Sequence, residues 1–292
     1  MAKLVYEDDY VRLYHGKNRV VTRELLEQGT LKIDTVVTDP PYSERTQNNS
    51  KGATGRVGKG AIRDRPMFFK PFSPKDVREC VAWLATLHPR WMILFSDDVL
   101  TGEYRTAARK AGVLYVRQGV WVKTRYAPRF VGDGPAAAAE YVNILHTAGE
   151  RRWNGGGHAA IYLHQYGGNS LHPTVKPLGL MLELIRDFTE PEKTVFDPYA
   201  GTGTTLLAAR QLKRRAVGIE ENMAICREAE KRLNQPELPG VQPDVARSFT
   251  TREMEMIFAQ GMVVSPDDIP KPQASHGLAG TIFDPLPLAP PF

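Results

Sequence analysis

The sequence predicts an α/β fold in which a doubly wound, mostly parallel sheet has helices on both faces. Apolar runs of strand length alternate with segments whose apolar residues recur at helical spacing, as expected for such a fold. The run Trp91–Phe95 is apolar without interruption, which is typical of a strand buried on both faces. A chain of 292 residues is long enough for one sizeable α/β domain with a small appendage.

The predicted strands follow one another along most of the chain. Residues 33–38 are apolar and β-branched, and Pro40 and Pro41 stop the run. The other expected strands are 11–14, 91–95, 113–123, 141–145, 194–196 and 216–219.

The predicted helices lie between these strands. Ser73 followed by Pro74 resembles an N-cap with proline at the first helical position. Gly112 ends a second predicted helix, and Pro177 opens an amphipathic one. The ranges behind these signals are 74–87, 101–111 and 177–188, and two more helices are expected at 204–212 and 222–233.

The composition divides the chain into a body and a C-terminal extension. Ten of the 22 prolines lie in residues 236–292, where the alternation of strands and helices stops. This extension carries a net charge of −4 and the remainder +9, so the basic character belongs to the body. We expect a catalytic domain at 1–235 and an extension at 236–292. The basic body indicates a polyanionic partner.

Cellular setting is inferred from what the sequence lacks. No stretch approaches the length of a membrane span, and the acidic N-terminus does not resemble a signal peptide. Cys80 and Cys226 both fall in predicted helices, so neither a disulfide framework nor a zinc site is expected. His146, His158 and His164 do not have metal-ligand spacing either. The sequence favours a cytoplasmic protein without membrane partner or metal.

The first motif is Asp39-Pro40-Pro41-Tyr42, directly after a predicted strand. Ligands bind beyond the carboxyl ends of strands in open parallel sheets. Asp39 and the Pro40 carbonyl could accept hydrogen bonds from an exocyclic amino group, which would free the lone pair of its nitrogen. Tyr42 offers a ring on which an extruded base can stack. The competing interpretation is a tight turn with an incidental aromatic residue.

The second motif is the strand–loop–helix segment 196–205, with Gly201 and Gly203 in its loop. No lysine precedes its Thr pair, and Leu206 breaks the dinucleotide fingerprint, so it is neither a P-loop nor a pyrophosphate site. Glu220, at the end of the next strand, is placed to bind ribose hydroxyls. An adenosyl ligand without pyrophosphate is the economical interpretation, against that of an ordinary glycine-rich turn.

The third motif, His172-Pro173-Thr174-Val175-Lys176-Pro177, comes just before a predicted helix. Thr174 and Lys176 could hold a carboxylate near that helix N-terminus. Taken alone, the motif is more simply a helix start bounded by proline, with a solvated lysine.

Together, and in this order, the three motifs resemble the β-class DNA amino-methyltransferases over roughly residues 10–234. The resemblance implies a class I methyltransferase fold, a seven-stranded mixed sheet with helices on both faces, and S-adenosylmethionine as cofactor. It implies that the catalytic residues are Asp39, Pro40, Pro41 and Tyr42. The cofactor-binding residues would be Asp39, His172, Thr174, Lys176, Asp197, Pro198, Tyr199, Ala200, Gly201, Thr202, Gly203, Thr204, Thr205, Glu220 and Glu221.

The chain departs from the family pattern near its N-terminus. Family members usually carry Gly-Asp early, and here the sequence reads His15-Gly16-Lys17-Asn18. Asn18 is the candidate to replace the acidic residue that contacts the cofactor's adenine. Tyr199 also stands where phenylalanine is more usual.

DNA contacts are expected in a flexible basic loop, 43–70, and in a small target-recognition region at about 146–172. The segment 151–153, Arg-Arg-Trp, is a candidate for base reading or a minor-groove wedge. The candidate DNA-binding residues are Arg45, Lys51, Arg56, Lys59, Arg63, Arg65, Lys123, Arg125, Arg129, Arg151, Arg152 and Trp153.

The sequence therefore predicts a site-specific DNA adenine-N6 methyltransferase, because Asp in the first motif position is similar to adenine-N6 enzymes. A cytosine-N4 enzyme, another methyl acceptor, and a DNA-binding protein that has lost turnover are the alternatives. DNA is the expected partner, and the resemblance leaves a homodimer and a cognate restriction endonuclease open.

Overall fold

The structure is a computed structural model that describes residues 2–52, 70–124, 135–165 and 175–235. All described residues fall within residues 1–248, the first of the two units into which the chain divides. The predicted extension 236–292 lies outside the described residues, as do His172, Pro173 and Thr174.

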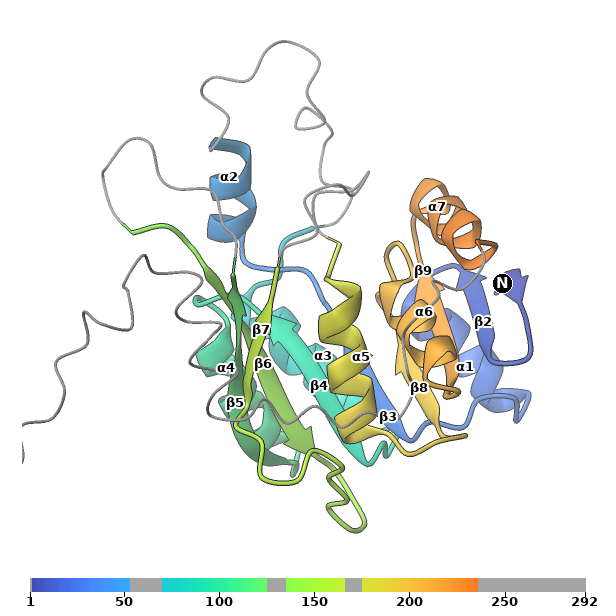
Figure 1. The fold of residues 1–292 in the computed structure, drawn as a ribbon, viewed down its shortest axis with the longest axis horizontal. Coiled ribbons are helices and arrows are strands. Elements are labelled where there is room, and N and C mark those ends of the chain that lie inside the picture. The colour runs from blue at the N-terminus through green and yellow to red at the C-terminus, as the bar shows by residue number, and fades with distance from the viewer. Residues whose placement is uncertain (1, 53–69, 125–134, 166–174, 236–292) are drawn as a thin grey trace, which may run out of the picture. The chain divides into compact units, whose positions relative to one another are not determined.

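A single nine-stranded mixed sheet forms the centre of the first unit, in the order β1-β2-β9-β8-β3-β4-β6-β5-β7 (Figure 1). The strands are β1 (Lys3–Glu7), β2 (Val11–His15), β3 (Thr35–Thr38), β4 (Trp91–Ser96), β5 (Leu114–Lys123), β6 (Ala139–His146), β7 (Ile161–His164), β8 (Thr194–Asp197) and β9 (Arg215–Glu220). Among the described pairings, β2-β9-β8-β3-β4 is parallel throughout, and β6 runs antiparallel to β4 and β5.

The predicted fold class is confirmed, but the sheet has nine strands where seven were expected. The two additional strands are at the edges: β1 pairs antiparallel with β2, and β7 pairs parallel with β5. Both edge strands have exposed or half-buried positions, so their sequences lack the long apolar runs that identified the central strands.

Helices cover both faces of the sheet, each over its own apolar core. The helices are α1 (Asn18–Glu27), α2 (Glu44–Gly52), α3 (Pro74–Ala85), α4 (Thr101–Lys110), α5 (Leu178–Phe188), α6 (Thr204–Gln211) and α7 (Met223–Leu233). One core joins α5, α6 and α7 to the sheet, and the other joins α1, α3 and α4. Figure 1 shows α5 in front of the sheet and α3 behind it.

The helix starts follow the predicted local signals. The Ser73 side chain and Asp76 form a reciprocal capping box at α3, with Pro74 in the first turn. Asn222 caps α7 by accepting from the backbone N–H groups of Ala224 and Ile225. Sequence reasoning missed α1, and it predicted a loop where α2 lies. No helix in the described parts of the chain is long and apolar enough to cross a membrane.

Candidate active site

Strand direction brings the polar residues of the predicted motifs to the end of the sheet at which the parallel strands finish. This end is called the Asp39 edge. Asp39 directly follows β3, while Asp197 and Glu220 end the parallel neighbours β8 and β9. Because β6 runs the opposite way, it begins at the edge where β4 ends, and this brings Glu140 there as well. The carboxyl ends of parallel strands are the usual position of a ligand site in such sheets.

A network of charges surrounds Asp39 at this edge. Lys176 Nζ donates to Asp39 Oδ2 at 2.5 Å and lies 3.2 Å from Glu140 Oε2. The Tyr42 hydroxyl donates to Glu140 Oε2 at 2.5 Å, and Lys123 Nζ lies 2.8 Å from Glu140 Oε1. The second oxygen of Asp39, Oδ1, is buried and has no hydrogen-bond partner within the described structure. One carboxylate oxygen of the first motif therefore remains free to accept a hydrogen bond.

Burial and charge act against each other on the ionisable groups of this network. Burial raises the pKa of Asp39, although Lys176 opposes the increase. Burial would also raise the pKa of Glu140, but Lys176 and Lys123 lower it to about 2. The Lys176 pKa is raised because the two carboxylates outweigh the loss of solvation. Lys176 therefore favours the ionised form of Asp39, which is the form that accepts hydrogen bonds.

Aromatic rings complete the surroundings of Lys176. Its Nζ lies 5.0 Å from the ring centroid of Tyr42 and 5.0 Å from that of Phe95, within the range of cation–π attraction. Phe95 is fully buried near the end of β4. The ammonium group is thus held by two carboxylates and two rings. The cofactor-carboxylate role predicted for Lys176 stays a prediction, because in this structure its partners are protein groups.

Glu140 was missed by sequence reasoning. It lies just before the predicted strand 141–145, after a run of four alanines that offers no motif. A carboxylate beside a buried strand was a weak signal. Its partners are distant in sequence, so only the fold makes it recognisable.

In the second motif, the Asp197 carboxylate organises the loop from inside. Its Oδ1 accepts from the Thr38 hydroxyl at 2.6 Å and from Tyr199 N at 3.1 Å, and its Oδ2 accepts from the Thr205 hydroxyl at 2.5 Å. The side chain is 2% exposed, and burial raises its pKa to about 6. These bonds tie the end of β3 to the start of α6. Ala200, Thr202 and Thr204 are also buried in this loop.

The two glycines and Glu220 form the rim of the same loop. Gly201 and Gly203 adopt φ values of 52° and 78°, which glycine reaches without the cost that a side chain would add. A Cβ added at Gly201 would have only the Tyr199 carbonyl oxygen near it, at 3.9 Å. Glu220 accepts backbone N–H bonds from Gly201 at 3.0 Å and Asn222 at 2.7 Å. Glu221, the other predicted acidic residue, is exposed.

Asn18 begins α1 and lies beside Tyr199. Burial raises the pKa of Tyr199, and the Asn18 side chain opposes this increase; Cys80 Sγ lies 3.9 Å from the Tyr199 hydroxyl. Asn18 therefore lies close to Tyr199 of the second motif. Contact of Asn18 with an adenine remains a prediction.

The predicted flexible loop 43–70 is corrected in its first part, where α2 spans Glu44–Gly52. Ser43 anchors this helix: Asp97 Oδ2 accepts from Ser43 N at 2.8 Å and from Ser43 Oγ at 2.5 Å, and it accepts from the Thr46 hydroxyl at 2.7 Å. No proline or glycine interrupts 43–51, so nothing local prevents a helix once its first turn is fixed. Residues 53–69 lie outside the described residues.

The predicted DNA-binding residues fall into four groups, of which the last is the segment 151–153. Arg45 is exposed on α2, with an ion pair to Asp98 at 3.5 Å. Lys123 is bound to Glu140 and belongs to the charge network. The backbone of Lys51 is part of α2, but its side chain lies outside the described structure, as do Arg56, Lys59, Arg63, Arg65, Arg125 and Arg129.

Arg151, Arg152 and Trp153 lie at the opposite edge of the sheet from Asp39. The antiparallel strand β6 carries the chain back to the start of β4, where Trp91 Nε1 donates to the Arg152 carbonyl at 2.8 Å. Trp153 packs on Phe188 with ring centroids 4.7 Å apart, and its Nε1 donates to the Gly156 carbonyl. This placement argues against Trp153 as a wedge into DNA that is bound at the Asp39 edge.

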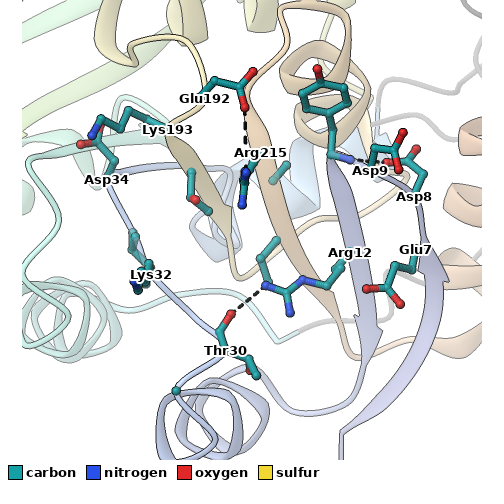
Figure 2. A pocket seen from close by; sticks show the side chains of 16 residues that line it. Glu7, Asp8, Asp9, Arg12, Thr30, Lys32, Asp34, Glu192, Lys193 and Arg215 are labelled. Carbon is teal, nitrogen blue, oxygen red and sulfur yellow. Dashed lines mark hydrogen bonds and ion pairs between the residues drawn. The ribbon is translucent and has the colours of Figure 1, made fainter.

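A cleft of about 610 Å³ also lies at the edge where the parallel strands begin. Figure 2 shows the side chains that line it, with Arg12 toward Thr30 and Arg215 toward Glu192. Its lining mixes four basic with five acidic residues, so the cleft has no strong preference for a charged ligand. It does not include any residue of the three motifs.

Three potential metal ligands, His158, Glu183 and Asp187, have one ligand atom each within 4.8 Å of one another. Protein groups hold two of them: His164 Nε2 lies 2.6 Å from Glu183, and Arg186 Nε lies 3.1 Å from Asp187. This cluster involves no residue of the Asp39 network, and the absence of a metal stays a prediction.

Comparisons with known proteins agree with the motifs and the topology. A family model described as DNA methylase matches residues 157–231. The type II methyltransferase M.HinfI of Haemophilus influenzae is 24% identical over 229 residues, which cover 70% of this chain and 63% of that protein. The chain spans between 20% and 63% of the length of four curated relatives that it matches.

Solved structures show the same fold at low identity. The M1.HpyAVI–SAM complex superimposes with a TM-score of 0.58 at 23% identity, over 77% of this chain and 100% of that one. The cytosine-N4-specific PvuII DNA methyltransferase gives a TM-score of 0.60 at 14% identity, over 89% of this chain and 95% of that one. The class I methyltransferase fold and the resemblance to DNA amino-methyltransferases are therefore confirmed.

Proposed function

We propose that this chain is an S-adenosylmethionine-dependent DNA methyltransferase that acts on adenine N6. The proposal rests on the surroundings of the Asp39 carboxylate. Asp39 follows β3 beside Tyr42, with Oδ2 paired to Lys176 and Oδ1 buried without a partner among the described residues. A buried, unpaired carboxylate oxygen is costly unless a ligand satisfies it. An exocyclic amino group of a flipped base is such a ligand.

The loop between β8 and α6 fits S-adenosylmethionine. Each oxygen of Glu220 accepts one backbone N–H bond and keeps a lone pair for a ribose hydroxyl. The space beside Gly201 allows a ligand to approach the backbone closely. Glu220 and the glycine loop would hold the cofactor, with Asn18 and Thr174 as further predicted contacts. When bound, the cofactor supplies a methyl group on a positively charged sulfur.

The chain's own residues would prepare the base for methylation. Asp39 Oδ1 and the Pro40 carbonyl would accept the two amino N–H bonds, which frees the lone pair of the nitrogen. Tyr42 would stack on the extruded base. Lys176 would favour the ionised form of Asp39 while the base reacts. Positioning and preorganised electrostatics would supply most of the rate.

Adenine is favoured over cytosine by the Asp at position 39, since cytosine-N4 enzymes more often carry Ser there. The fold neighbour that is cytosine-N4-specific keeps cytosine as the second candidate. A DNA-binding protein that has lost turnover is the third, because Asn18 replaces the usual acidic residue. We propose DNA as partner through the exposed Arg45 and the predicted basic loop. A homodimer and a cognate restriction endonuclease are further proposals by family resemblance.

The test is methyl transfer from labelled S-adenosylmethionine to DNA of mixed sequence, followed by nucleoside analysis. Label in N6-methyladenine is the expected result. Label in N4-methylcytosine would assign cytosine, and not adenine, as the acceptor base. Asp39→Ala should reduce the rate by at least about 100-fold while the protein stays folded. Glu103→Gln, in an ion pair with Arg78 away from the motifs, is the matched control. Retained activity in Asp39→Ala would defeat the mechanism.

A further inference from the structure

Glu140 connects three parts of the candidate site that are far apart in the sequence. Its side chain is 13% exposed at the start of β6. It accepts from the Tyr42 hydroxyl of the first motif, from Lys176 of the third, and from Lys123 at the end of β5. Two carboxylates and two lysines therefore balance one another at the sheet edge, and Glu140 contacts both lysines.

The number of donors on Lys176 shows what Glu140 does for Asp39. An ammonium group has three N–H donors and no fixed direction of approach, so a lysine facing a single carboxylate is free to bind both of its oxygens. Here Lys176 divides its donors between Asp39 Oδ2 and Glu140 Oε2. Asp39 Oδ1 remains without a partner in the described structure. Glu140 thus competes for Lys176 and leaves this oxygen for another ligand.

Glu140 also fixes the ring of Tyr42. The hydroxyl donates to Glu140 at 2.5 Å, and Lys176 lies 5.0 Å from the ring centroid. A tyrosine that is held at its hydroxyl and on its ring keeps one orientation, which lowers the entropy lost when a base stacks on it. A buried ion-pair network seldom adds net stability, so stability alone is a weak explanation for this arrangement.

We propose that Glu140 is a positioning residue for methyl transfer, which orients Tyr42 and draws Lys176 away from the second oxygen of Asp39. The inference rests on the proposed function. It assigns no contact between Glu140 and the base. Its effect on the reaction passes through Tyr42 and Lys176.

The groups that face Asp39 give the proposal a distinct pH signature. They are Lys176, Tyr42 and Glu140, with Asp197 on the neighbouring strand. The negative charge of Glu140 raises the pKa of Asp39. A neutral residue at position 140 should therefore move the acidic limb of the kcat–pH profile to lower pH. Loss of packing alone would not move that limb.

The experiment compares Glu140→Gln, Glu140→Asp and Tyr42→Phe with the control Glu103→Gln, in the full chain with S-adenosylmethionine and DNA. Glu140→Gln should lower kcat by about tenfold to a hundredfold with little change in the cofactor Kd. Tyr42→Phe should show part of that decrease in kcat. The decrease in the double variant of Glu140→Gln and Tyr42→Phe should be smaller than the product of the two single decreases. Glu140→Asp should recover part of the rate because the carboxylate returns.

A second measurement does not depend on catalysis. With tyrosines labelled at Cζ with carbon-13, the Tyr42 resonance is assigned by its absence in Tyr42→Phe. It should shift in Glu140→Gln and stay in place in Glu103→Gln. An unchanged resonance, or a kcat of Glu140→Gln within twofold of the parent at all pH values, overturns the inference while the proposed function stands. Absence of methyl transfer by the parent chain overturns both.

Discussion

Removing the charge of Lys176 should destabilise the fold in a pH-dependent way. Lys176 Nζ lies 2.5 Å from Asp39 Oδ2 and 3.2 Å from Glu140 Oε2, and the three side chains are 10%, 27% and 13% exposed. At an effective dielectric constant of about 20, two unit charges 3.2 Å apart attract by about 5 kcal/mol. The lysine regains solvation on unfolding, which offsets part of this attraction. Lys176→Met should therefore reduce the free energy of unfolding by about 3 to 5 kcal/mol at pH 8.

The sign of the pH dependence follows from the two carboxylates left behind. Without Lys176, the folded-state pKa of Asp39 rises further, because the opposing cation is gone. An acid with a raised pKa in the folded state favours folding at low pH, and that stability is lost as pH rises through the raised value. Lys176→Met should therefore be closest to the parent near pH 4 and furthest from it at pH 8.

Urea unfolding followed by circular dichroism, at pH 4 to 8, measures this difference. Lys75→Met is the matched control, because Lys75 is exposed and pairs only at the surface with Glu79; it should change stability by about 0.5 kcal/mol or less. Adding Glu140→Gln to Lys176→Met should restore part of the loss by removing one surplus carboxylate. A loss below about 1 kcal/mol that is independent of pH would refute the argument.

Three further predictions concern stability away from the Asp39 network. Burial raises the pKa of Asp187 from 3.8 to about 6, so its ionised form disfavours folding by about 3 kcal/mol at neutral pH. As pH rises from about 4 to 6, ionisation of Asp187 should lower the free energy of unfolding, and Asp187→Asn should remove this contribution. The same pH dependence of urea unfolding in the parent and in Asp187→Asn would contradict the prediction. Gly218→Ala places a Cβ 2.7 Å from Leu206 Cδ1 and 3.0 Å from Ala200 Cβ, and should cost about 1 to 3 kcal/mol by thermal unfolding. Ser73→Ala removes the α3 capping box and should cost about 1 kcal/mol, whereas an unchanged midpoint would show that the cap contributes nothing.

Local sequence signals predicted the central elements well. The apolar run Trp91–Phe95 is β4 within one residue, and the Ser73-Pro74 signal begins α3. These predictions succeeded because a buried strand and a helix N-terminus each have physical requirements that neighbouring residues meet. The edge strands β1 and β7 and the helix α2 had no such signal. Ser43 and Thr46, at the start of α2, are hydrogen bonded to Asp97, which lies 54 residues after Ser43.

The candidate site divides in the same way. The three motifs and their order were enough to propose Asp39, Lys176 and the glycine loop as site residues from the sequence alone. They did not show that Lys176 binds Asp39 and Glu140. Nor did they show that the Asp197 carboxylate accepts hydrogen bonds from Thr38, Thr205 and the backbone. The pairings of Lys176 with Asp39 and of Asp197 with Thr38 join residues more than a hundred positions apart, so no local pattern encodes them.

The sequence by itself thus determined the fold class and the central strands, and it supplied the proposal of which residues carry methyl transfer to an amino group. Only the tertiary structure decided which of them meet. The deciding feature is the direction of β6, which runs against β4 and β5. It brings Glu140 to the Asp39 edge and carries Arg152 and Trp153 to the other. Strand direction within a sheet is set by long-range packing and connections, and the residues of the strand alone do not specify it.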